Sequence, residues 1–298
     1  MKDRLTDLGY AAGWRVVRAL PLPVARALFD SVADRAAGAD GPGTQRLRRN
    51  LRRVVGPTPT DAELDALVKA GLRSYGRYWL EAFRLPSQTR RQHYDGFHFT
   101  NHELLTEAMT GGRGAICALP HMGNWDAAAA WVVAQDWRLV TVAERLKPER
   151  LFERFVAYRE SLGMEVLPLT GGARPPLDVL GERASQGYLV ALLSDRDLSA
   201  RGVEVRFFGG RTRMPPGPAL LAIRTGAPLF AVHTWFAPDR VEAALDPIEI
   251  PDPDSAPLDV RVALVTQRLA DAFEKAVAAH PQDWHMLQKL WLDQPARV

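Results

Sequence analysis

His121 and Asp126 are the residues whose types and spacing could do acid–base chemistry in this chain, in the pattern H-x4-D. They follow the short apolar run Gly114–Ala118, and a helix-like run comes after them. The pattern predicts a strand, a tight loop turning at Gly123, and a helix. Because α/β sheets usually bind ligands at the carboxyl ends of strands, His121 is a candidate general base with Asp126 as its candidate partner.

The same two residues also fit an ordinary structural role. His121 can be a surface histidine, and Asp126 can cap the helix that it opens, where the helix dipole favours an acid. H-x4-D by itself is a weak pattern, so the case for a site depends on residues further along the chain.

A second candidate is the segment Ser194–Asp197, which comes directly after the apolar run Tyr188–Leu193. If that run is a strand, Asp195 and Asp197 reach the same edge of the sheet as His121 and can hold its imidazole in one tautomer. The alternative is a solvated loop. Further on, Arg213–Pro218 is rich in proline and glycine and opens a helix, so its backbone N–H groups can stabilise an oxyanion. Its alternative is a rigid connection.

Strand-like and helix-like runs alternate from Phe97 onward, which predicts an α/β fold with a largely parallel central sheet flanked by helices. The strand-like runs are Gly114–Ala118, Leu139–Val142, Val166–Leu169, Tyr188–Leu193, Val203–Phe207 and Pro228–Trp235. The helix-like runs are Asn101–Met109, Asp126–Ala134, Pro148–Leu162, Leu177–Ser185, Gly217–Arg224 and Leu258–Ala279. Before them, a capping box at Thr60-x-x-Glu63 starts a helix with apolar residues from Leu64 to Phe83.

Basic charge is concentrated at the N-terminus. Residues 1–55 hold eleven Lys and Arg against five Asp, a net of +6, which leaves −3 for the rest of a chain whose total is +3. Apolar residues recur at helical spacing from Leu5 to Val32, broken at Pro21 and Pro23. We expect residues 1–56 to be basic amphipathic helices that contact an anionic membrane surface, and 57–298 to be the α/β domain. The alternative is helices packed on the domain.

Several classes of protein are disfavoured by what the sequence lacks. The single cysteine, Cys117, excludes an internal disulfide and a cysteine metal cluster. There is no glycine-rich nucleotide loop and no cluster of histidines. The absence of a G-x-S-x-G elbow argues against an ordinary serine hydrolase. The basic run Arg46–Arg53 lacks any nucleic-acid-binding pattern, so nucleic acid is not an expected partner. Without a spanning segment or a signal peptide, we expect a peripheral protein on the cytoplasmic side of the membrane.

Taken in order, these motifs resemble the lipid A biosynthesis acyltransferase branch of the lysophospholipid acyltransferase superfamily. The resemblance rests on His121-x4-Asp126, Asp195-Arg196-Asp197-Leu198, Phe207-Phe208-Gly209, Arg213–Gly217 and the ending Trp284–Gln288, and it covers about Leu64 to Leu292. Within that branch the chain looks most like the enzymes that acylate phosphatidylinositol mannosides.

The resemblance implies a glycerol-phosphate-acyltransferase-like fold and transfer of a fatty acyl group, such as palmitoyl, from acyl-CoA to a mannose hydroxyl of a membrane glycolipid. It also implies that no metal or redox cofactor is needed. It implies catalytic roles for His121, Asp126 and Asp195, and leaves open whether Asp195, Asp197 or Asp126 is the partner of the histidine. Substrate contacts are expected at Glu144, Arg159, Arg196, Asp197, Met214 and Gly217. The acyl chain is expected between the sheet and the helix Leu64–Phe83.

Three alternatives remain open from the sequence. The first is the same fold acting on another glycolipid or lysolipid, with acyl carrier protein as the donor. The second is a hydrolase of lipids or thioesters. The third is a membrane-binding module without catalysis.

Overall fold

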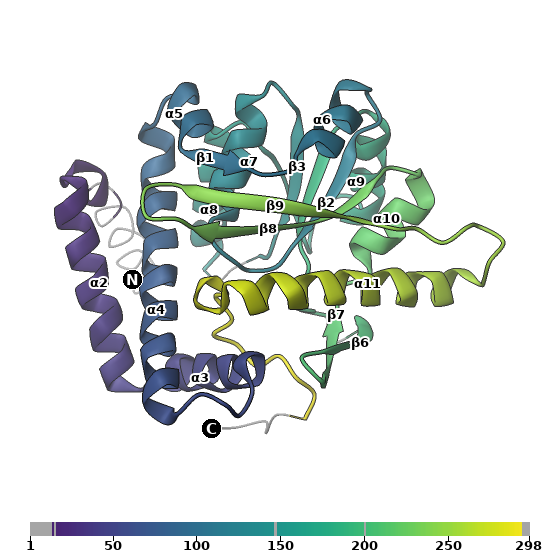
Figure 1. Cartoon of the computed structure of the whole chain (residues 1–298). Helices are drawn as coiled ribbons and strands as arrows, with labels where there is room; N and C mark the ends of the chain where they lie inside the picture. Colours follow the sequence, from purple (N-terminus) through teal and green to yellow (C-terminus); the bar gives the residue numbers. More distant parts are fainter. Residues whose placement is uncertain (1–13, 15, 146–147, 200, 294–298) are drawn as a thin grey trace.

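The computed structural model describes residues 14, 16–145, 148–199 and 201–293, and it shows a seven-stranded sheet covered by helices on both faces (Figure 1). The strands of this sheet are β1 (Phe97–Phe99), β2 (Ala115–Leu119), β3 (Leu139–Ala143), β4 (Glu165–Pro168), β5 (Leu189–Leu193), β8 (Leu229–Phe236) and β9 (Val241–Ile248). Their spatial order is β1-β9-β8-β2-β5-β3-β4. The pair β8–β9 is antiparallel and the other neighbouring pairs are parallel. The predicted fold class is confirmed.

Helices connect these strands and also precede them. They are α2 (Leu22–Ala39), α3 (Pro42–Val55), α4 (Asp61–Arg84), α5 (Arg90–Asp95), α6 (Glu103–Thr110), α7 (Trp125–Ala134), α8 (Glu149–Ser161), α9 (Pro176–Ser185), α10 (Gly217–Thr225) and α11 (Leu258–Ala279), with 3₁₀ turns at Leu85–Ser87 and Pro281–Asp283. No described helix combines the length and the hydrophobicity that are needed to cross a bilayer.

The central strand β2 shows why the sheet needs cover on both faces. All five of its residues are buried. Ile116 and Ala118 pack into a core cluster with α9, α10 and α11, whereas Cys117 and Leu119 point the other way into a cluster with α6, α7 and α8. A continuous apolar run of this kind is typical of a parallel strand that is buried on both sides.

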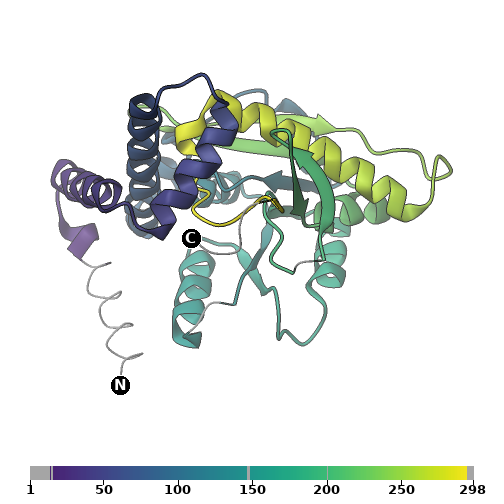
Figure 2. The same ribbon diagram turned by 90° about the horizontal axis from the view of Figure 1, so that it is seen from below.

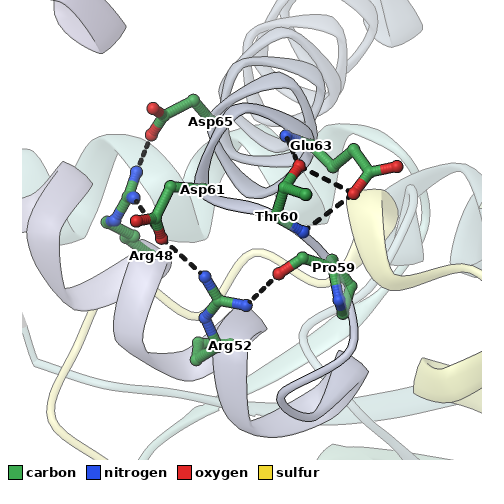
Figure 3. Close-up of polar contacts among 7 residues, drawn as sticks. All are labelled: Arg48, Arg52, Pro59, Thr60, Asp61, Glu63 and Asp65. Atoms are coloured by element: carbon green, nitrogen blue, oxygen red, sulfur yellow. Dashed lines mark hydrogen bonds and ion pairs between the residues drawn. The ribbon is translucent and has the colours of Figure 1, made fainter.

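The N-terminal helices pack at one edge of the molecule, where α2 lies beside α4 and α3 lies near α11 (Figures 1 and 2). The predicted capping box starts α4: the Thr60 hydroxyl accepts a hydrogen bond from the N–H of Glu63, and the Glu63 carboxylate accepts one from the N–H of Thr60 at 2.8 Å. Arg52 of α3 donates to Asp61 at 2.7 Å, and Arg48 pairs with Asp61 at 3.4 Å and with Asp65 (Figure 3). Part of the basic charge of α3 is therefore neutralised within the protein.

Two differences from the predicted elements matter for the site. The strand Val203–Phe207 exists as β6, but it pairs with β7 (Gly210–Met214) in a separate antiparallel hairpin rather than in the sheet. The predicted loop from Arg213 therefore begins only after Met214. The sequence pattern also missed β1 and β9.

Those two strands carry little pattern of their own. The strand β1 is only three residues long, and β9 ends in the sequence Leu-Asp-Pro-Ile, whose polar residue and proline interrupt any apolar alternation. At the other end of the chain, the first part of the helical pattern predicted from Leu5 to Val32 falls on residues 1–13 and 15, outside the described residues. Its second part, from Val24 to Val32, lies in α2.

Candidate active site

Three neighbouring strands end at one edge of the sheet, and each leads into a polar side chain singled out from the sequence. The strand β2 leads to His121, β5 leads to Asp195 and β3 leads to Glu144, and the three strands are adjacent in the order β2-β5-β3. Their carboxyl ends meet because the three strands run parallel. The sheet therefore brings together residues that lie far apart in the sequence.

His121 and Asp195 form a tight pair. Nδ1 of His121 lies 2.6 Å from one carboxylate oxygen of Asp195, and the backbone N–H of His121 donates to the other oxygen at 3.0 Å. Asp195 is fully buried, whereas 24% of the His121 side-chain surface is exposed to solvent. Of the three possible aspartate partners, the structure joins Asp195 to the histidine. This arrangement matches a general base oriented by a carboxylate.

Asp195 remains ionised despite its burial. Burial raises the pKa of its carboxyl, but the charge of His121 and hydrogen bonds from His121 and Trp284 outweigh that effect and hold the pKa below its usual value. The ionised carboxylate favours a proton on Nδ1 of His121, which leaves Nε2 as the nitrogen that can accept a proton.

Gly123 makes the turn after His121 possible. Its φ is +57°, and a Cβ at this position would lie 2.4 Å from the carbonyl oxygen of Thr234. Both the left-handed backbone and the close approach therefore require glycine.

A segment near the C-terminus, Asp283–His285, holds the same turn from the other side. The N–H of Gly123 donates to the carbonyl of Asp283, and the N–H of His285 donates to the carbonyl of His121, each at 2.8 Å. An antiparallel bridge joins Met122 to Trp284 between these two bonds. The backbone on both sides of the candidate base is therefore fixed.

Asp126 has different partners. Its carboxylate accepts one hydrogen bond from Nε of Arg159 and one from the hydroxyl of Tyr78, both at 2.9 Å. Burial lowers the pKa of Arg159, but the Asp126 carboxylate raises it more, so the net pKa lies above its usual value. The cap of α7 is Asn124, whose side chain accepts from the N–H of Ala127 at 3.0 Å. The capping role predicted for Asp126 is therefore wrong, although it does lie in the first turn.

His121 lines a cleft of about 320 Å³ together with Glu144, Arg196 and the loop from Pro215 to Pro218. Glu144 and Arg196 face each other across 3.5 Å, and the Glu144 side chain is half exposed. Carboxylates accept hydrogen bonds from sugar hydroxyls, and guanidinium groups bind phosphates and carboxylates. The predicted contacts at these two positions therefore lie where a substrate can reach them.

Asp197 lines the cleft but also shapes its own loop. Its carboxylate accepts hydrogen bonds from the N–H of Ser199 at 2.9 Å, the hydroxyl of Ser199 at 2.7 Å and the N–H of Gly202 at 2.8 Å. Burial raises the pKa of this carboxyl, and the hydrogen bonds from Ser199 and Gly202 lower it below its usual value.

The loop proposed as an oxyanion site supplies fewer donors than expected. The side chain of Met214 is buried in the core, and Pro215 and Pro216 have no N–H to donate. Gly217 lines the cleft and is the first residue of α10, where backbone N–H groups are free of intrahelical partners. Of the positions Met214 to Gly217, Gly217 is therefore the candidate that can offer a free backbone N–H at the cleft.

An apolar cavity lies next to the cleft, between the sheet and α7. Cys117 and Ala191 line it from the strands, Ala129 lines it from α7, and Asp126 and Arg159 also border it. Val142, Leu192 and Leu193 line both this cavity and the cleft of His121, so the two spaces adjoin. Its position differs from the groove predicted beside the helix Leu64–Phe83, since α7 and not α4 forms its wall.

Sequence reasoning missed the contacts by which some further residues complete the site. Trp284 donates its indole N–H to Asp195 at 2.9 Å, and Tyr78 holds Asp126. His285 is buried, with Nε2 2.9 Å from the Ser74 hydroxyl. No spacing rule links these positions to His121, because each lies on an element remote in sequence.

Comparison with known proteins identifies the family of this chain. The sequence profile of the family described as bacterial lipid A biosynthesis acyltransferase matches residues 3–293. A phosphatidylinositol mannoside acyltransferase of Mycolicibacterium smegmatis is 51% identical over 97% of this chain and 92% of its own length. Proteins of the same name from two strains of Mycobacterium tuberculosis are 50% identical over 96% of this chain and 89% of theirs. This chain therefore belongs to the bacterial lipid A biosynthesis acyltransferase family.

Proposed function

We propose that this acyltransferase moves a fatty acyl group, palmitoyl in the first instance, from acyl-CoA to a mannose hydroxyl of a phosphatidylinositol mannoside. The observation that carries the chemistry is the pair of buried Asp195 and partly exposed His121, in a cleft that adjoins an apolar cavity. The names of relatives that are about half identical over nearly the whole chain support the choice of acceptor.

The reaction begins with Nε2 of His121, which takes the proton of the mannose hydroxyl as its oxygen attacks the thioester carbonyl. Asp195 stabilises the imidazolium that forms. The tetrahedral intermediate then expels the CoA thiolate, and the imidazolium returns a proton to it. One C–S bond breaks and one C–O bond forms, so the products are the ester and free CoA. General-base assistance of this kind contributes ~10²–10⁴-fold.

Transfer is direct, without an acyl-enzyme. The developing oxyanion needs donors that are already in place, and the N–H of Gly217 and the guanidinium of Arg196 both line the cleft. The thiol of Cys117 is not a nucleophile here, because burial raises its pKa to about 12. The reaction uses no metal or redox cofactor, since proton transfer and oxyanion stabilisation are both supplied by side chains and backbone.

The acyl chain of the donor enters the apolar cavity between α7 and the sheet, with its carbonyl at the cleft. The free volume of this cavity, about 70 Å³, is smaller than a long acyl chain. Binding therefore requires the side chains between α7 and β5 to move apart. Ala129 and Ala191 make this easier, because their small side chains fill little of the space that the acyl chain has to occupy.

The protein docks to the cytoplasmic face of the membrane as a peripheral protein, since its acceptor and product are bilayer lipids. The outer face of α2 supports this placement: Val24, Leu28 and Val32 recur every four residues and are 46–56% exposed. Residues 1–56 are then the membrane-associating part and 57–298 the catalytic part.

The donor and acceptor are tested by incubating the protein with a panel of lipid acceptors and a radiolabelled donor, either palmitoyl-CoA or palmitoylated acyl carrier protein. Label from CoA on a phosphatidylinositol mannoside supports the proposal. Label on another lipid keeps the chemistry but rejects the acceptor, and transfer from the carrier protein alone rejects the donor. Thioester hydrolysis that stays undiminished when acceptor is added would identify a hydrolase.

A further inference from the structure

We propose that Trp284 is a positioning residue of the active site, whose indole N–H fixes the orientation and the charge of Asp195 and thereby sets the basicity of the His121–Asp195 pair. The inference rests on the proposed function of that pair. Trp284 touches neither reacting atom and acts through the carboxylate.

The hydrogen bonds to Asp195 leave its carboxylate a single orientation. One oxygen lies 2.6 Å from Nδ1 of His121, and the other accepts the backbone N–H of His121 at 3.0 Å and the indole N–H of Trp284 at 2.9 Å. Asp195 and Trp284 are both fully buried, so water does not replace a lost donor at low cost. Without the indole, the second oxygen keeps only one of its two donors.

The indole is itself held in place by its surroundings. Its ring packs edge-on against Phe207 of the β6–β7 hairpin, with ring centres 5.9 Å apart, and against Trp291 at 6.1 Å. The bridge between Trp284 and Met122 also ties its backbone to the turn that carries His121. Through Trp284, the hairpin and the C-terminal segment, which lie outside the main sheet, therefore help to hold the carboxylate of Asp195 in place.

The predicted consequence is a change in pH dependence. The indole N–H stabilises the negative charge of the Asp195 carboxylate. When this donor is removed, the carboxylate attracts the imidazolium of His121 more strongly. The His121–Asp195 pair therefore keeps its proton up to a higher pH. The other titratable or charged groups around the pair are His285, Glu144, Arg196 and Asp197. They are unchanged by a substitution at Trp284, so the shift is attributable to the lost bond.

The test is Trp284→Phe, which keeps an aromatic ring but removes the N–H. We expect the acid limb of the pH–rate profile to move up by about one pH unit, a factor of ten in proton affinity. On that limb kcat/KM for acyl transfer should fall about tenfold, and at higher pH it should fall less. KM for palmitoyl-CoA should stay unchanged, because the indole touches no substrate.

Trp291→Phe is the matched control. Trp291 is also fully buried in the same cluster, but its indole N–H donates to the backbone carbonyl of Phe207 at 3.0 Å. This variant should lose comparable stability and keep the wild-type pH profile. If the acid limb of Trp284→Phe does not move, or if it moves equally in both variants, the proposal is wrong.

Two further measurements keep the outcome decisive. If Trp284→Phe does not fold, replacement of the indole by the isosteric benzothiophene keeps the shape and removes the N–H, and the same shift is expected. If the wild type transfers no acyl group, the proposed function fails on its own. The protonation midpoint of the His121–Asp195 pair, read from the ring ¹⁵N shifts of His121, then still tests the role of Trp284.

Discussion

Two buried aspartates near the candidate base differ in their partners, and this difference separates their tasks. Asp195 bonds to the imidazole of His121, whereas Asp126 bonds to Arg159 and Tyr78. The first pair includes a side chain that substrate can reach, and the second holds α7 to α8 and α4. We therefore expect substitutions at Asp195 to act on turnover, and substitutions in the Asp126–Arg159 pair to act first on stability.

Asp195→Asn should lower kcat by about 10²–10⁴-fold, because an amide no longer stabilises the imidazolium and can favour the wrong tautomer. The measurement is acyl transfer at saturating donor and acceptor, with the fold checked by circular dichroism. Near-normal turnover would move the orienting role to Asp126 or Asp197.

Arg159→Met should reduce the free energy of unfolding by about 3–5 kcal/mol, because it leaves the Asp126 carboxylate buried without its cation. Arg183→Met is the control. The pair of Arg183 with Glu165 is about 29% exposed on each side, and its loss should cost less than about 1 kcal/mol. Urea unfolding measures both, and equal losses would contradict the assignment of a buried pair.

At the scale of elements, α7 and α2 carry the two contacts with lipid that we propose. The helix α7 contributes the small residues Ala128 and Ala129 to the wall of the apolar cavity, which an acyl chain has to widen. The helix α2 buries Ala25 and Ala33 and exposes larger apolar residues on its outer face. In both helices the positions of small and large apolar residues determine which lipid the helix can contact, an acyl chain for α7 and the membrane surface for α2.

Ala191→Leu narrows the cavity from the β5 side and should shift the preference of the enzyme toward shorter donors. We expect the ratio of kcat/KM for palmitoyl-CoA to that for octanoyl-CoA to fall at least tenfold, since a branched side chain occupies space that a long chain needs. The ratio serves as its own control for overall activity. An unchanged ratio would place the acyl chain elsewhere.

Val24→Glu combined with Leu28→Glu should weaken binding to anionic liposomes, because charged side chains do not enter the headgroup region favourably. The matched control is Val260→Glu with Leu264→Glu on α11, an exposed apolar pair with the same spacing. We also expect binding to weaken with salt, which screens the attraction between arginines and lipid. An equal effect of both double variants would reject α2 as the docking face, and insensitivity to salt would reject the electrostatic part.

For the molecule as a whole, buried histidines couple stability to pH. Burial, followed by the charge of His121, lowers the pKa of His285 to about 3, from an ordinary value of 6.5. Between these values the unfolded chain binds a proton that the native protein does not, so stability is fully present above pH 6.5 and is lost as pH falls. Asp283 opposes this, because burial raises the pKa of its carboxyl.

We therefore expect the urea concentration at the unfolding midpoint to decrease when the pH is lowered from 7 to 5. The decrease should be smaller in His285→Gln. Chemical denaturation at several pH values, at constant ionic strength, measures this slope. The same slope in wild type and variant would mean that another group dominates the acid sensitivity.

The sequence predicted the fold well because buried parallel strands are continuous apolar runs, and it predicted His121 and Asp195 because both follow such runs directly. It could not choose Asp195 as the histidine's partner, since that depends on β2 and β5 being neighbours in the sheet. The bond between Trp284 and Asp195 could not be predicted for a similar reason, although Trp284 begins a segment that carries the family resemblance. Its partner is 89 residues away in the chain, and an indole has no pattern that marks it as a donor to a carboxylate.

The central claim is that His121 acts as the general base of acyl transfer, and the most direct test is the rate of label transfer from palmitoyl-CoA to a phosphatidylinositol mannoside by wild type and His121→Ala. We predict a loss of about 10²–10⁴-fold in the variant, with unchanged circular dichroism and liposome binding. Transfer at the same rate by both proteins would contradict the account.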